Sequence, residues 1–252
     1  MESIATPFVA RPHGKAQAEP SAPIQYTITR SVEVNPEVLR RHRVIAGQVP
    51  GPYVDAYKVL RTKILQILRE HGWNAFAVTS PNPHAGKTVA AINLSLSLAL
   101  DISQTVLLVD ANLRHPSVHT AFGLTPREGL ADYLLDDVPI ERLLINPKGI
   151  NRFVILPGSR PLPDSAELLA SPKMARLVDE LKHRYPSRIV VFDLPHLTTA
   201  DALAFAPYVD AALLVLEAGR TTQSQLVEAL GHLNTTPLLG TVLNKAEPTS
   251  GS

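Results

Sequence analysis

Residues 75–88 read AFAVTSPNPHAGKT, and this stretch decides the fold. AFAVTS (75–80) is a short apolar run typical of a buried strand, whereas KTVAAINLSLSLALD (87–101) has the length and pattern of a helix. The loop between them ends in GKT (86–88), as phosphate-binding loops of the form G-x-x-x-x-G-K-[ST] end. The strand–loop–helix context therefore predicts a P-loop; the alternative is a chance Gly-Lys-Thr at a helix start.

The front of this loop is unusual because Pro81 stands where the pattern has its first glycine. The chemistry tolerates the change, since phosphate is bound by backbone N–H groups, the helix dipole and one lysine. We expect His84 to adopt a positive φ, which histidine tolerates better than most residues, and Gly86 to let the backbone approach the ligand. The residues expected to bind the nucleotide here are Pro83, His84, Ala85, Gly86, Lys87, Thr88 and Val89.

Two further motifs place a carboxylate at the end of an apolar run. TVLLVD (105–110) ends in Asp110, and IVVFD (189–193) ends in Asp193 in the manner of a Walker B strand. A carboxylate beside a P-loop can hold Mg²⁺ or orient a nucleophile, although Asp110 could instead cap the next helix. We expect Thr88, Asp110 and Asp193 to form a Mg²⁺ site. The same two carboxylates, with Lys87 at the β- and γ-phosphates, are the expected catalytic groups.

The remaining apolar runs predict the class of fold. FVILPG, IVVFD, AALLVLEA and GTVLN are each short enough to be a strand, and helical patterns lie between them, clearest at 166–185. Strands this apolar are covered on both faces, so we expect an α/β P-loop NTPase fold with a mostly parallel central sheet and helices on each side. We assign residues 51–246 to this domain, most of the proline-rich stretch 1–50 to a disordered tail, and 247–252 to a short flexible C-terminus.

The composition narrows the possible functions. The chain has 252 residues, a net charge of +1 and no cysteine. The absence of cysteine excludes disulfides, thiolate metal sites and cysteine nucleophiles. The charge gives no sign of nucleic-acid binding, and no apolar run approaches the roughly 20 residues of a membrane span. We therefore expect a cytoplasmic protein that neither binds nucleic acid nor inserts into a membrane, so that a peripheral link to a membrane would need a partner.

The three motifs, in this chain order, resemble those of the bacterial tyrosine kinases of capsule and exopolysaccharide synthesis. These are P-loop proteins related to the MinD/ParA ATPases, and the likeness extends to the autokinase branch associated with exosortase-linked loci. It covers roughly residues 50–246. The family loop has a small residue where this chain has Pro81, whereas Pro83 and GKT (86–88) match.

The resemblance implies ATP and Mg²⁺ as cofactors, a homo-oligomer, and a membrane-bound polysaccharide co-polymerase as activating partner. It places Asn244 of TVLNK beside the adenine, where the alternative is a turn residue that ends the strand. DAYKVLR (55–61) occupies the position of the family helix that packs between subunits. An ordinary solvated helix face with i,i+3 ion pairs is the alternative for this segment.

The chain departs from the family pattern in two ways. After the second apolar run the family has Asp-x-Asp-x-Arg, whereas this chain has Asp110, Asn112 and Arg114. An amide at position 112 cannot carry charge or accept a proton, so turnover should be weakened, and we expect Arg114 to be structural or interfacial. The family's C-terminal tyrosine cluster is also missing, because no tyrosine follows Tyr208; Tyr26 is the tyrosine best placed to enter a neighbour's site.

Three functions are compatible with these residues. The leading one is an ATP-dependent tyrosine-kinase-like protein, with phosphoryl transfer or ATP hydrolysis, that regulates exopolysaccharide synthesis or export. The second is a nucleotide-dependent switch for a membrane polysaccharide transporter, with little turnover. The third, a positioning ATPase like MinD or ParA, fits less well because the loop lacks their signature lysine and the C-terminus lacks an amphipathic helix.

Overall fold

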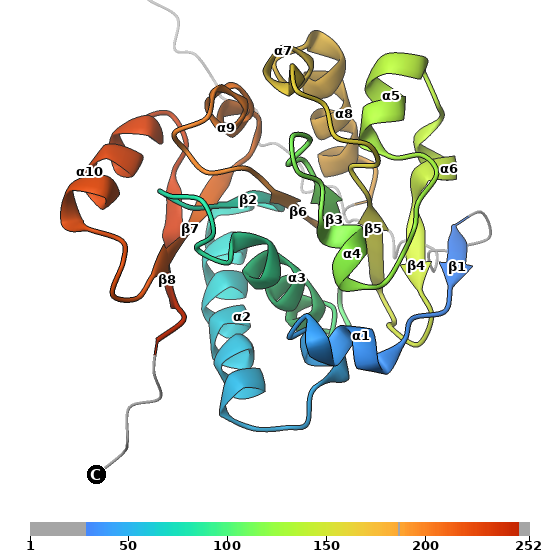
Figure 1. Cartoon of the computed structure of the whole chain (residues 1–252), viewed down its shortest axis with the longest axis horizontal. Coiled ribbons are helices and arrows are strands. Elements are labelled where there is room, and N and C mark those ends of the chain that lie inside the picture. The colour runs from blue at the N-terminus through green and yellow to red at the C-terminus, as the bar shows by residue number, and fades with distance from the viewer. Residues whose placement is uncertain (1–28, 186, 247–252) are drawn as a thin grey trace, which may run out of the picture.

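The computed structural model describes residues 29–185 and 187–246, which form a central sheet with helices on both faces (Figure 1). The strands are β1 (Arg30–Val32), β2 (Ala75–Thr79), β3 (Thr105–Asp110), β4 (Ile145–Pro147), β5 (Phe153–Leu156), β6 (Arg188–Asp193), β7 (Ala211–Glu217) and β8 (Leu238–Asn244). The helices are α1 (Pro36–Arg41), η1 (Ile45–Gly47), α2 (Pro52–His71), α3 (Lys87–Leu98), α4 (Val118–Ala121), α5 (Leu130–Asp136), α6 (Ile140–Leu143), α7 (Ser165–Leu169), α8 (Pro172–His183), α9 (Ala200–Phe205), η2 (Ala206–Tyr208) and α10 (Gln223–His232). The strand order is β1-β4-β5-β3-β6-β2-β7-β8, and each neighbouring pair is parallel except β4 with β5.

The core has two layers, one on each face of the sheet. Helices α1 to α4 pack on one face and α5 to α10 on the other, each over its own cluster of buried apolar side chains. Along β3, Leu108 contributes to the first cluster and Leu107 to the second, as the alternation of side chains in a strand requires. The prediction of a mostly parallel α/β sheet covered on both faces is confirmed. In the described residues, no helix combines the length and apolar character needed to cross a bilayer.

The strand and the helix on either side of the predicted P-loop are both present. The strand predicted at 75–80 is β2, and the helix from Lys87 is α3. The pattern at 166–185 is not one helix, however, but α7 followed by α8. The break has a local cause: Pro172 has no N–H to continue the earlier helix, and the hydroxyl of Ser171 accepts the Met174 N–H as an N-cap.

Regular structure begins before residue 51, where the predicted domain starts. Residues 30–47 supply β1, α1 and η1. Leu39 of α1 and Ile45 of η1 are buried in the same cluster as the helices that follow. The rest of the expected tail, including Tyr26, and the expected flexible C-terminus at 247–252 lie outside the described residues.

Candidate nucleotide-binding site

The loop between β2 and α3 has the backbone form that a phosphate-binding loop needs. His84 has φ 61° and Gly86 has φ 88°, so the predicted positive φ at His84 is confirmed. A side chain on Gly86 would place its Cβ 2.2 Å from Nδ2 of Asn244. Glycine is therefore required here both by the backbone angle and by the close approach of β8.

Side chains from the far edge of the sheet fix this loop in place. Asn244, at the end of β8, donates from Nδ2 to the Ala85 carbonyl at 2.8 Å. Lys245 donates to the His84 carbonyl at 2.7 Å and to Oε1 of Glu217 at 3.1 Å. Asn244 and Lys245 thus each hold one backbone carbonyl of the loop. The placement of Asn244 beside the adenine stays a prediction.

Asp110 and Asp193 lie side by side at the carboxyl ends of neighbouring strands. They are register partners in the β3–β6 ladder, and both are fully buried. Oδ2 of Asp193 accepts the Thr88 hydroxyl at 2.6 Å, and Oδ2 of Asp110 accepts the N–H groups of Ser117 and Val118 at 2.8 and 2.9 Å. Within the described residues, the second oxygen of each carboxylate has no hydrogen-bond partner.

The pKa values of both carboxylates in this pair are raised. Burial and then the charge of Asp193 raise the pKa of Asp110 well above its ordinary value. Burial also raises the pKa of Asp193, although Lys87 and the Thr88 hydroxyl oppose that shift. Two unpartnered carboxylate oxygens beside a threonine hydroxyl are a donor set that fits Mg²⁺, a cation that binds few protein ligands and fills its shell with phosphate and water. No group of three or more His, Asp or Glu side chains suited to a metal is found in the described residues.

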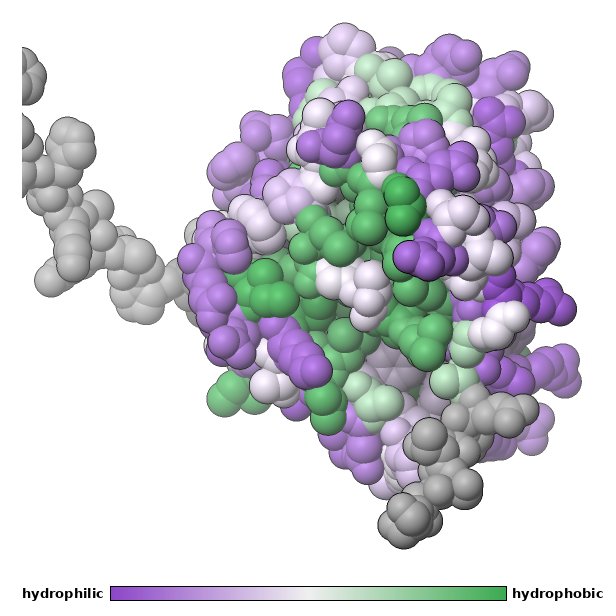
Figure 2. All heavy atoms as spheres, turned by 90° about the vertical axis from the view of Figure 1, so that its left-hand side faces the viewer, coloured by the Kyte–Doolittle hydropathy of each residue, from purple (hydrophilic) through white to green (hydrophobic). Residues whose placement is uncertain are grey.

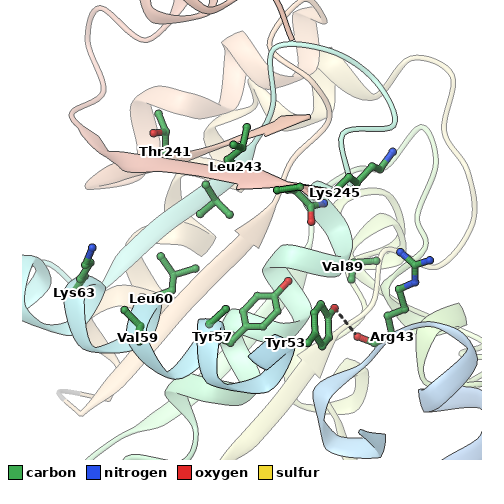
Figure 3. Close-up of a pocket in the computed structure, with 15 residues that line it drawn as sticks. Arg43, Tyr53, Tyr57, Val59, Leu60, Lys63, Val89, Thr241, Leu243 and Lys245 are labelled. Carbon is green, nitrogen blue, oxygen red and sulfur yellow. Dashed lines mark hydrogen bonds between the residues drawn. The ribbon is translucent and has the colours of Figure 1, made fainter. Parts of the chain in front are cut away.

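Two adjoining cavities open from the loop. The first, of about 650 Å³, is lined by most of the predicted loop residues and by three histidines. The second, of about 580 Å³, shares Gly86, Val89 and Lys245 with the first and continues between α2 and β8. In Figure 3 the side chains of α2 face those of β8 across this second cavity, with Arg43, Val89 and Lys245 gathered at one end.

The predicted residues divide between these spaces. Those that line the first cavity are Pro83, His84, Gly86, Lys87, Thr88 and Val89. Asn244 lines the second cavity, whereas Ala85 is buried and contributes its carbonyl to Asn244. No ion pair to Lys87 exists within 4 Å in the described residues, so its ammonium group is available to a ligand.

The two residues that follow β3 in the motif have clear structural partners. Arg114 pairs through Nε with Oδ2 of buried Asp201 at 2.7 Å, and Asp201 also accepts the Ser165 hydroxyl. Asn112 is nearly buried, lines the first cavity and donates from Nδ2 to the His115 carbonyl at 3.2 Å. On α2, Asp55 and Lys58 form an i,i+3 ion pair at 2.8 Å, as an ordinary helix face would.

Several side chains at the site were missed from the sequence. Lys245 directly follows Asn244 and could have been found by extending the last strand by one residue. His196 lines the first cavity, and its Nδ1 lies 2.6 Å from the Thr198 hydroxyl. Burial, then Lys87 and His84, lower the pKa of His196. Arg43 lies 44 residues before Lys87, and no local motif connects the two.

The parallel sheet, the loop at the start of α3 and the paired carboxylates beside it define a P-loop nucleotide-binding protein. No family model matches the chain. Among characterised proteins, it is 34% identical over 193 residues to tyrosine-protein kinase YwqD of Bacillus subtilis, covering 75% of this chain and 80% of YwqD. It is 32% identical over 220 residues to the succinoglycan biosynthesis transport protein ExoP of Rhizobium meliloti, covering 82% of this chain and 27% of ExoP.

Solved structures agree with these relatives. The chimerical protein CapA2B2 superposes with a TM-score of 0.73 at 25% identity, over 86% of this chain and 93% of that one. The kinase domain of the Escherichia coli tyrosine kinase ETK superposes with a TM-score of 0.67 at 25% identity, over 79% of this chain and 80% of that one. MinD from Pyrococcus horikoshii, at 0.57 and 22% identity, shares the fold. The chain belongs to the bacterial tyrosine-protein kinase family.

Proposed function

We propose that this protein binds MgATP and transfers the γ-phosphoryl group to a hydroxyl acceptor, as a cytoplasmic regulator of exopolysaccharide synthesis or export. The observation that carries this proposal is the contact between Thr88 and Asp193 at the start of α3, beside a second buried carboxylate with an unused oxygen. A buried carboxylate oxygen without a partner is costly to desolvate, which supports a bound cation at this pair.

Each residue has a distinct task in this proposal. Lys87 neutralises charge on the β- and γ-phosphates, and Thr88 with Asp193 holds Mg²⁺, which when bound polarises the phosphoryl oxygens. Asp110, with one oxygen fixed by backbone N–H groups, uses the other to orient the attacking hydroxyl and accept its proton while the bond from the γ-phosphorus to the bridging oxygen of ADP breaks. The apolar cavity between α2 and β8 takes the base, beside Asn244.

A second candidate is a nucleotide-dependent switch with little turnover, and Asn112 is the observation that favours it. The amide is nearly buried and already donates to the His115 carbonyl, so it braces the turn after β3. An amide in that position adds no charge at the metal and cannot accept a proton. In that case the bound nucleotide would control assembly with a membrane partner.

One face of the molecule supports the proposal of partners. Exposed apolar side chains gather over α10, β8 and α2 on the side shown in Figure 2: Val227, Leu230, Leu238, Leu243 and Val59. Among the described residues, β8 is an edge strand of the sheet. Patches of this kind mark sites of protein association. A homo-oligomer, and a membrane-bound polysaccharide co-polymerase that brings the protein to the inner membrane, are the partners that the family relationship suggests.

The proposed activity is tested by incubating the chain with Mg²⁺ and γ-labelled ATP. Lys87→Ala should lose at least about 100-fold of both phosphate release and protein labelling, because it removes the cation at the transferred group. Lys148→Ala, an exposed lysine far from the loop, is the matched control and should match the wild type. Equal labelling and equal phosphate release from wild type and Lys87→Ala would contradict the proposed phosphoryl-transfer activity. Tight MgATP binding with negligible turnover in the wild type would favour the switch.

A further inference from the structure

The turn between α1 and η1 is held in an unusual conformation at the mouth of the cavity between α2 and β8. Arg43 has φ 57°, in the left-handed region that few residues other than glycine adopt. Its carbonyl accepts hydrogen bonds from the Tyr53 hydroxyl and from Nδ2 of Asn93, both at 2.9 Å. The surrounding structure thus fixes a conformation that costs roughly 1–3 kcal/mol for a residue with a side chain.

The group that fixes this turn belongs to the P-loop helix itself. Asn93 lies on α3, fully buried, six residues after Lys87. Its Oδ1 accepts the Ile45 N–H at 2.9 Å, and its Nδ2 also donates to the Tyr53 hydroxyl at 2.8 Å. Both N–H groups and the carbonyl oxygen of this amide are therefore used to attach the segment 43–45 and Tyr53 to the helix that carries the phosphate-binding lysine.

The side chain that this turn projects lies at the nucleotide pocket with no protein partner. Arg43 lines the second cavity together with Gly86 and Val89, and Figure 3 shows its guanidinium beside Val89. In the described residues the guanidinium makes no hydrogen bond or ion pair. If the turn alone mattered, glycine would adopt it without strain. The backbone of Arg43 is therefore strained, and its guanidinium lies at a largely apolar cavity without a hydrogen bond or ion pair to the described residues.

We propose that the guanidinium of Arg43 stacks on the base of the bound nucleotide, so that the segment 43–47 closes the pocket that α2 and β8 leave open. This inference rests on the proposed function, since it assumes that the first cavity takes the phosphates. An arginine plane packs well on any nucleobase, because it combines cation–π attraction with flat apolar contact. The contact also connects nucleotide occupancy to the segment before α2.

The test is calorimetric titration of the full chain with two ligands, MgATP and Mg²⁺-tripolyphosphate, which share phosphates but not the base. Arg43→Gly keeps the left-handed turn and removes only the side chain, so it should retain the thermal stability of the wild type. We expect Arg43→Gly to weaken MgATP binding about 10-fold and to change tripolyphosphate binding less than 2-fold, on the scale of one base-stacking contact. Arg43→Lys keeps the charge without the plane and should recover less than half of the loss on a logarithmic scale.

Arg41→Ala, an exposed arginine of the same segment that does not line the cavity, is the matched control and should bind both ligands as the wild type does. Equal weakening of both ligands by Arg43→Gly would overturn the proposal in favour of a phosphate contact, and unchanged binding of both would overturn it outright. Full recovery by Arg43→Lys would also overturn it, since charge alone would then suffice. A wild type that binds neither ligand would instead defeat the proposed function, and this proposal with it.

Discussion

Replacing Gly86 by alanine should damage the loop through two separable effects. The first is the backbone, because φ 88° is strained for any residue with a Cβ. The second is the approach of β8, since the new Cβ would lie 2.2 Å from Nδ2 of Asn244 and would displace that side chain from the Ala85 carbonyl. Gly149→Ala isolates the first effect, because Gly149 has φ 85° and nothing lies within 4 Å of an added Cβ.

The magnitudes follow from these two effects. A positive φ at alanine costs about 1–2 kcal/mol, and the lost hydrogen bond about 0.5–1.5 kcal/mol. Gly149→Ala should therefore lower the free energy of unfolding by about 1–2 kcal/mol, and Gly86→Ala by about 2–3 kcal/mol. Asn244→Ala alone should cost about 1 kcal/mol. The double variant Gly86→Ala/Asn244→Ala should cost about 1 kcal/mol less than the sum of its parts, because the hydrogen bond can be lost only once.

Urea denaturation of the four variants, followed by circular dichroism, measures these differences without any ligand. The reasoning is refuted if Gly86→Ala destabilises no more than Gly149→Ala, since β8 would then not constrain the loop. Strict additivity of Gly86→Ala and Asn244→Ala would refute it as well, because the two residues would act independently.

Four further outcomes are expected. Asn112→Asp adds a third acid to the buried pair, so it should lower the melting temperature without Mg²⁺, and added Mg²⁺ should restore that temperature. The substitution should also raise turnover if the amide limits the reaction. An unchanged melting temperature and unchanged turnover would show that position 112 affects neither. The buried carboxylates have folded pKa values above their unfolded ones, so their contribution to stability falls as pH rises from about 4 through neutrality; the Mg²⁺-free melting temperature should drop between about pH 5 and 8, and drop less in Asp110→Asn. Arg114→Ala leaves Asp201 buried without its cation and should cost about 2 kcal/mol in urea denaturation, below the usual 3–5 because Arg114 is partly exposed; a cost near zero would contradict the pairing. Leu243 is 63% exposed on the apolar face, and Leu243→Ser should lower the mass measured by light scattering if that face joins copies of the chain. The same substitution should change the free energy of unfolding by no more than about 0.5 kcal/mol.

The parts of the fold that could be predicted from the sequence are those with a local signature. A run of apolar residues followed by one acid marks the carboxyl end of a buried strand, and Gly-Lys-Thr marks the start of a helix, so Lys87, Asp110 and Asp193 were found together. The positive φ at His84 also follows from its place in the loop. These features depend on a few neighbouring residues and on the rule that parallel strands share one functional edge.

The parts that could not be predicted depend on contacts distant in the chain. The strand β1 could not be predicted, because it has three residues and is paired with β4, more than 100 positions away. The turn at Arg43 is held at the pocket by the side-chain amide of Asn93, 50 residues later in the chain. Lys245 donates to the carbonyl of His84, 161 residues earlier in the chain. No period or motif encodes such pairs, so the role of Arg43 becomes visible only in the folded chain.

The central claim is that the loop before α3 and the two carboxylates beside it bind MgATP. A crystal structure of the chain with Mg²⁺ and a non-hydrolysable ATP analogue tests it most directly. The account predicts the triphosphate along residues 83–89, with Mg²⁺ on the Thr88 hydroxyl and Asp193, and the base between α2 and β8. Phosphates bound elsewhere, or a metal that leaves Asp193 hydrogen-bonded only within the protein, would contradict it.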